Sequence, residues 1–110
     1  MIQHLYIFQM AHTGAVKIGR SSDVERRRKQ IQTGCPYEIK TILILDGQGK
    51  LEPKLHKMLN EYRTAHFRGE WFREGGLAEL PQWIYSQFDL EIINTWWERN
   101  KELPGPGRNV

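Results

Sequence analysis

Two short apolar runs on either side of a turn open the chain and limit the kind of sheet it can build. Leu5 to Phe8 are aromatic or branched, and Val16 to Ile18 resume with alternating character, so each run predicts a strand. Between them, Ala11 to Ala15 form a short loop that contains Thr13-Gly14, a typical turn pair. We therefore expect the chain to begin with a β-hairpin.

A helix and a third strand are predicted to follow the hairpin. Ser22 with Glu25 three residues later has the capping-box pattern, and Gly34 is a common C-terminal stop. Lys40 to Leu45 (KTILIL) is short, apolar and branched, which predicts a buried strand between the hairpin and a helix.

The first predicted helix carries an arginine where a small domain usually has an apolar side chain. Val24, Arg27, Arg28 and Ile31 have the i, i+3, i+4, i+7 spacing of one helical face. An ionised guanidinium is costly to bury unless an anion meets it. We expect Arg27 to lie at the edge of the core and to meet an acidic side chain or a phosphate, with Arg28 as the alternative inward arginine.

Further helices are predicted in the second half of the chain. Apolar residues keep helical spacing from Leu51 to Arg63, where Pro53 is tolerated in the first turn. Leu77 to Phe88 and Leu90 to Leu103 predict two more helices, and residues 104–110 predict a flexible tail. The order of elements predicts a small mixed α/β (α+β) domain with a three-stranded sheet and extra C-terminal helices.

The composition fits one globular domain. The chain has 110 residues, 39% of them hydrophobic, and its single cysteine excludes an internal disulfide framework. The N-terminus lacks a basic segment followed by a long apolar run, which argues against a signal peptide or a membrane span. We expect a cytoplasmic, intracellular protein with no membrane partner.

Charge is distributed unevenly along the chain. Residues 17–40 hold seven Lys/Arg against three Asp/Glu, residues 50–73 hold six against three, and residues 74–103 hold two against six. The basic first part of the chain predicts a surface that binds a polyanion, and the acidic C-terminal part predicts a second surface that does not contact it. A charged face that only contacts solvent is the alternative.

Several site classes have no motif here. The sequence contains no phosphate-binding Gly-rich loop, no H-E-x-x-H, no Cys-x-x-Cys pair and no nucleophile elbow, and its His and Cys lack zinc-site spacing. The remaining candidates for chemistry are Tyr6 and Lys17 on neighbouring strands, Arg27 on the first helix, and Glu52 with His56 one turn later on the second helix.

These candidates occur in an order that resembles the GIY-YIG endonuclease superfamily. The matching elements are Leu5-Tyr6, Lys17-Ile18-Gly19, Asp23-x-x-x-Arg27, Leu51-Glu52-x-x-Leu55-His56 and Gly69-Glu70-Trp71-Phe72, spread over residues 4–72. The second and last of these elements are similar to the compact phage and bacterial branch, in which the second motif commonly reads KIG. The resemblance implies a three-stranded antiparallel sheet flanked by helices and hydrolysis of phosphodiester bonds.

The resemblance also implies a role for each residue. Glu52 would hold one Mg²⁺ or Mn²⁺ ion, Tyr6 would act as the general base, Lys17 would replace the second tyrosine, and Arg27 would bind the cut phosphate. An ammonium near Tyr6 would favour the phenolate. His56 is a supporting residue.

The sequence departs from the superfamily pattern at two positions. His4-Leu5-Tyr6 lacks the glycine of the first motif, and Ile31 stands where several of these nucleases have His or Tyr. Each role also has a structural alternative: Tyr6 as a core aromatic residue, Lys17 as a solvent-facing strand residue, and Glu52 as a residue that favours a helix N-terminus.

We therefore expect a metal-dependent endonuclease acting on DNA. Residues 1–103 would form one domain, with a core at 4–72 and a helical extension at 77–103, and the DNA backbone would contact Arg20, Arg26, Arg28 and Lys29. Two alternatives are a nucleic-acid-binding module without catalysis and a protein-interaction domain that uses Trp83, Trp96 and Trp97. In addition to DNA, we consider two partners: a second copy, bound through the C-terminal helices, and a separate targeting protein.

Overall fold

A three-stranded antiparallel sheet forms the centre of the molecule. The computed structural model describes residues 1–64 and 71–100. The strands are β1 (His4–Met10), β2 (Val16–Ser21) and β3 (Ile39–Leu45), and β1 pairs with both of the others in the order β2-β1-β3. The predicted hairpin and the α+β fold class are confirmed.

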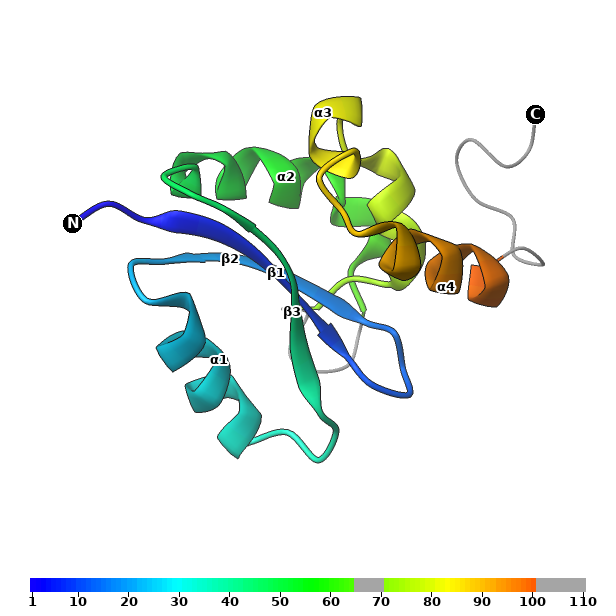
Figure 1. Ribbon diagram of the computed structural model, residues 1–110, viewed down its shortest axis with the longest axis horizontal. Coiled ribbons are helices and arrows are strands. Elements are labelled where there is room, and N and C mark those ends of the chain that lie inside the picture. Colours follow the sequence, from blue (N-terminus) through cyan, green and yellow to red (C-terminus); the bar gives the residue numbers. More distant parts are fainter. Residues whose placement is uncertain (65–70, 101–110) are drawn as a thin grey trace.

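Helices cover both faces of the sheet (Figure 1). Helix α1 (Val24–Thr33) packs on one face, and α2 (Glu52–Met58) lies on the other. Side chains alternate along a strand, so β1 serves two cores. Leu5 and Ile7 join the core beneath α2 and the C-terminal helices, whereas Tyr6 and Phe8 join the core beneath α1.

The start of α1 differs from the prediction by one residue. Asp23, rather than Ser22, is the N-cap: its backbone is extended, and its Oδ1 accepts a hydrogen bond of 3.1 Å from the amide of Arg26. Ser21 supports this turn because its hydroxyl accepts from the Asp23 amide at 3.0 Å. Gly34 ends the helix as predicted.

The third strand is less buried than predicted. β3 is an edge strand, so its side chains have strand neighbours on one flank only. Ile39 and Leu43 are buried, but Ile44 is 45% exposed. The apolar run from 40 to 45 correctly predicted a strand, but the prediction of a buried strand was wrong for much of its length, including Ile44.

The helix predicted over 51–63 is shorter and has 3₁₀ turns at both ends. These turns are η1 (Gly49–Leu51) and η2 (Asn60–Tyr62), on either side of α2. Pro53 lies in the first turn of α2, as predicted.

The single helix predicted over 77–88 was wrong. The segment forms a 3₁₀ helix, η4 (Glu74–Glu79), and a four-residue helix, α3 (Gln82–Tyr85), with Pro81 between them. Proline disfavours helical geometry in the residue before it, and Leu80 is accordingly extended, with φ −67° and ψ 146°.

Helix α4 (Leu90–Asn100) confirms the last predicted helix within the described residues. Trp96 is buried in the core, whereas Trp83 and Trp97 are 50% and 38% exposed. A partner surface or homodimer formed by these helices stays a prediction. Residues 101–103 of the predicted helix, the predicted tail and the Gly69-Glu70 part of the last motif lie outside the described residues. None of the helices in the described residues is long and apolar enough to cross a membrane.

Candidate functional site

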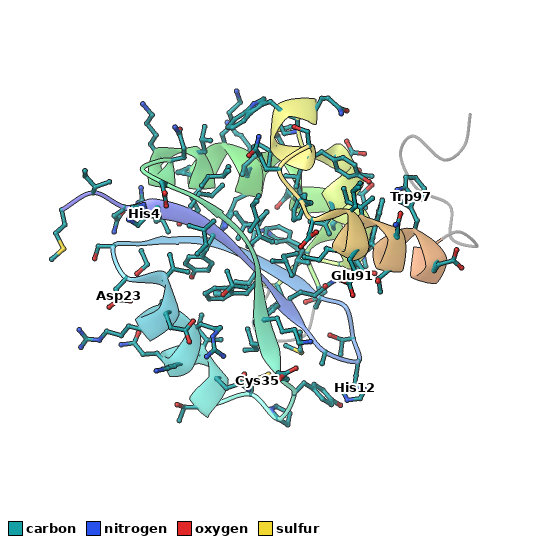
Figure 2. The ribbon with its side chains drawn as sticks, viewed as in Figure 1. His4, His12, Asp23, Cys35, Glu91 and Trp97 are labelled. Atoms are coloured by element: carbon teal, nitrogen blue, oxygen red, sulfur yellow. The ribbon has the colours of Figure 1, made fainter. Side chains whose placement is uncertain are left out.

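Three elements meet at one end of the sheet. β2 ends at Ser21 and passes through Asp23 into α1, and α2 packs beside the same strand. Figure 1 shows α1 and α2 starting at this end, on opposite faces. Figure 2 shows His4 and Asp23 toward this end and His12, at the hairpin, toward the other. Residues from separate parts of the chain can therefore act together here.

Glu52 lies at this junction between two basic side chains. It is the first residue of α2. Its Oε2 is 3.6 Å from Nε of Arg20, and its Oε1 is 3.9 Å from Nε2 of His56. The Glu52 side chain is 23% exposed, so the carboxylate is sheltered but accessible.

His56 connects α2 to β2. Its Nε2 lies 2.5 Å from the carbonyl oxygen of Ile18, and its ring meets the Phe72 ring edge-on at a centroid distance of 5.3 Å. Because a carbonyl oxygen only accepts, Nε2 carries the proton of this bond. His56 thus holds α2, which begins at Glu52, against the strand.

Tyr6 lies across the strand pair on the α1 side. It is the register partner of Gly19, and a Cβ at Gly19 would overlap the Tyr6 hydroxyl oxygen and Cζ. The ring stacks on Phe8 at 4.0 Å and is only 2% exposed. Because Gly19 has no Cβ, the Tyr6 ring can lie directly over β2. Tyr6 is also a core residue.

Lys17 shares this face with Tyr6, as the hairpin pattern predicted. It pairs with Phe8 and is half-buried. Its Nζ lies 6.0 Å from the centre of the Trp71 ring. Lys17 is therefore a half-buried, packed residue rather than a fully solvent-facing one, and its strand pair lies two residues along the register from that of Tyr6.

The predicted inward position of Arg27 was wrong. Arg27 is exposed and donates to Oε1 of Gln30 at 3.4 Å. Arg28 is the inward arginine: it donates to the Ile39 carbonyl at 3.2 Å and to Oε1 of Glu25 at 2.6 Å. Val24 and Ile31 form the apolar stripe of α1 that packs on the core, and burying the charge of Arg27 there without an anion would be costly.

The pair formed by Arg28 and Glu25 affects the titration of both groups. The hydrogen bond from Arg28 lowers the pKa of the Glu25 carboxyl below its ordinary value, and the bond to Glu25 raises the pKa of the Arg28 guanidinium. Arg28 is thus engaged within the protein. Arg26, Arg27 and Lys29 remain exposed on the outer side of α1.

The comparison with protein families agrees with the extent of this fold. The model of the T5orf172 domain matches residues 3–96. The chain belongs to the T5orf172 domain family. This family occurs in phage and bacterial proteins and is associated with nuclease-related families. No curated protein and no solved structure matches the chain.

The T5orf172 match covers every residue considered for the site. Glu52 offers a sheltered but accessible carboxylate, and Mg²⁺ is commonly held by one or two carboxylates and several waters. Both contacts of its carboxylate, at 3.6 and 3.9 Å, are longer than a hydrogen bond, which leaves lone pairs for an ion. Among the described residues no three His, Cys, Asp or Glu side chains cluster as a metal site. A single carboxylate is a ligand set that a hydrated hard cation such as Mg²⁺ accepts, because that ion keeps several of its waters.

Two features of this T5orf172 site were missed by sequence reasoning. Arg20 was expected to contact DNA, but it also pairs with Glu52, and no sequence signal predicts this contact. Phe72 is a buried core residue that also exchanges two backbone hydrogen bonds of 2.8 Å with Val16 at the start of β2. Phe72 thereby covers one end of the β2 edge and packs beside His56.

Proposed function

We propose that this T5orf172 domain is a metal-dependent endonuclease of the GIY-YIG type that hydrolyses phosphodiester bonds in DNA. The observation that carries the proposal is the sheltered but accessible carboxylate of Glu52, fixed between Arg20 and His56 at the end of β2. The family's association with nuclease-related proteins supports the same class of activity.

Glu52 and its neighbours form the centre of the proposed reaction. A bound Mg²⁺ or Mn²⁺ ion would supply positive charge to stabilise the reacting phosphate and the departing oxygen. Glu52 would hold this ion, while His56 keeps α2 packed against β2. Arg20 would leave the carboxylate for a phosphate oxygen, since a guanidinium fork matches phosphate geometry.

Tyr6, assisted by Lys17, would accept a proton from the attacking water. In hydrolysis a water oxygen bonds to phosphorus, one phosphorus–oxygen ester bond breaks, and a proton moves from the water to the departing oxygen. The Tyr6 phenolate would accept the proton of the water, and the Lys17 ammonium on the same face would favour that phenolate. The Tyr6 hydroxyl lies over Gly19 on the α1 face of β2, whereas α2 contacts the same strand from the other face, so the substrate would have to meet both faces at this strand.

The exposed side of α1 would bind the substrate. Arg27 would contact the phosphate that is cut, and Arg26 and Lys29 would contact the backbone beside it. The exposure of Arg27 suits this role, because its guanidinium stays accessible to an incoming phosphate.

The first experiment is incubation of the purified protein with supercoiled plasmid in Mg²⁺, Mn²⁺ or EDTA. We expect nicked or linear plasmid with either metal and intact plasmid in EDTA. Arg27→Ala should slow cutting far more than Arg26→Ala, its exposed neighbour with the same charge. Equal losses would remove the special role of Arg27.

A nucleic-acid-binding module without catalysis is the second candidate. The burial of Tyr6 to 2% exposure favours it, because a base needs contact with the attacking water. Salt-sensitive DNA binding with no cutting in any metal would establish this alternative and reject the nuclease.

A further inference from the structure

A basic groove lies on the outer side of α2, next to the candidate site. Its volume is about 630 Å³, and it is lined by Pro53, Lys54, His56, Lys57, Asn60 and Arg63. Three of the lining side chains are cations and none is acidic. The groove is therefore electrostatically suited to an anion.

The groove and the candidate site share a wall. His56 lines the groove, and the same imidazole lies 3.9 Å from the carboxylate of Glu52. Pro53 follows Glu52 directly in the chain and also lines the groove. An extended anion that passes Glu52 can thus continue along the outer side of α2.

The lysines of the groove are accessible. Lys54 and Lys57 are exposed, and neither forms an ion pair with any residue in the described part of the chain. They are three residues apart, so they project from neighbouring turns of one face, which rise about 5 Å apart. On α1, by contrast, Arg28 is bound to Glu25.

Arg63 gives the groove a fixed end. Its guanidinium lies 5.0 Å from the centre of the Phe72 ring, and its Nε donates to Oδ1 of Asn60 at 3.0 Å. This packing holds a positive charge in place without burying it, since Arg63 is exposed. The groove thus combines two flexible ammonium groups with one oriented guanidinium.

We propose that this groove binds the phosphodiester backbone of nucleic acid beside the phosphate that is cut. The inference rests on the proposed nuclease function and adds a second contact surface to α1. Backbone phosphates meet Lys54, Lys57 and Arg63, and these contacts fix the position of the strand without reading its sequence.

The test is the salt dependence of DNA binding. Fluorescence anisotropy with a short labelled duplex is measured in EDTA, so that cutting does not interfere. Lys54→Gln and Lys57→Gln should each lower the slope of log K against log salt by about one unit and weaken binding by about tenfold near 0.1 M salt. Lys40→Gln is the matched control, because Lys40 is an exposed lysine on β3 outside the groove.

Amide chemical shifts locate the contact independently. Titration with a short oligonucleotide should shift the amides of Lys54, His56 and Asn60 more than those of β3. The groove proposal is overturned if both lysine variants keep the wild-type salt slope, or if Lys40→Gln lowers the slope as much as they do. The proposed nuclease function would still stand in that case, provided that the wild type cuts plasmid. Absence of any DNA binding by the wild type would overturn both proposals.

Discussion

The imidazole Nε2 of His56 lies 2.5 Å from the carbonyl oxygen of Ile18, which ties helix α2 to the edge strand β2. This contact brings together residues that are 38 positions apart in the sequence. Because a carbonyl oxygen only accepts, Nε2 is the donor of this hydrogen bond. His56 and Arg20 together flank Glu52, the proposed metal ligand.

Replacing His56 should therefore lower stability. His56→Ala leaves the Ile18 carbonyl without its donor and should reduce the free energy of unfolding by about 1–3 kcal/mol. His56→Gln keeps a donor and should recover part of the loss. Urea unfolding measures both, with Lys57→Ala as an exposed neighbour expected within about 0.5 kcal/mol of the wild type. Equal stability of His56→Ala and the wild type would show that the contact contributes nothing.

The space between Gly19 and Tyr6 gives a second prediction. Gly19→Ala introduces a Cβ that overlaps the tyrosine ring, so overpacking should cost about 1–3 kcal/mol of unfolding free energy. The same change should cost clearly less in a Tyr6→Ala background, where the overlap is gone. A double-mutant cycle measured by urea unfolding tests this coupling.

Gly34→Ala is the control for this cycle. A Cβ at Gly34 meets nothing within 4 Å, and its φ of −98° suits an L-residue, so the variant should be neutral or slightly more stable. If Gly19→Ala lowers the free energy of unfolding equally in the wild type and in the Tyr6→Ala background, the account is contradicted.

The ion pair between Arg28 and Glu25 predicts a pH effect. The folded-state pKa of Glu25 lies below its ordinary value of 4.5, chiefly because Arg28 donates a hydrogen bond to it. The pair therefore stabilises the fold fully above that value, and this contribution is lost as pH falls through the lower, folded-state pKa. Arg28→Met should lose less stability than the wild type on acidification.

Urea midpoints measured between neutral pH and about pH 3 check this effect. Arg26→Met removes the same charge from an exposed position and should keep the acid dependence of the wild type. Parallel profiles for the wild type and Arg28→Met would show that the pair does not stabilise the fold.

The sequence predicted the sheet well because strand patterns are local. Alternation along β1 and β2 placed Tyr6 and Lys17 on one face, and the structure confirms this. Edge position is not local, however. The run that contains Ile44 looks the same whether a strand is central or at an edge, so its exposure could not be foreseen.

The two arginines of α1 show a case in which helical periodicity alone cannot tell which side chain points toward the core. With about 100° per residue, Arg27 and Arg28 lie at nearly equal angles, about 50°, on either side of the stripe formed by Val24 and Ile31. The tertiary contact with the Ile39 carbonyl of β3 selects Arg28 as the inward residue, and Glu25 on the same helix pairs with it. The break at Pro81, in contrast, was visible in the sequence, since proline restricts the residue before it.

The measurement that tests the central claim most directly is plasmid cleavage by Glu52→Gln beside Glu61→Gln. Both variants replace a carboxylate by an amide of the same shape, but Glu61 is exposed and does not line the groove. We predict that Glu52→Gln reduces cutting in Mg²⁺ more than about a hundredfold while DNA binding in EDTA persists, and that Glu61→Gln cuts like the wild type. Cutting by Glu52→Gln at the wild-type rate would contradict the account.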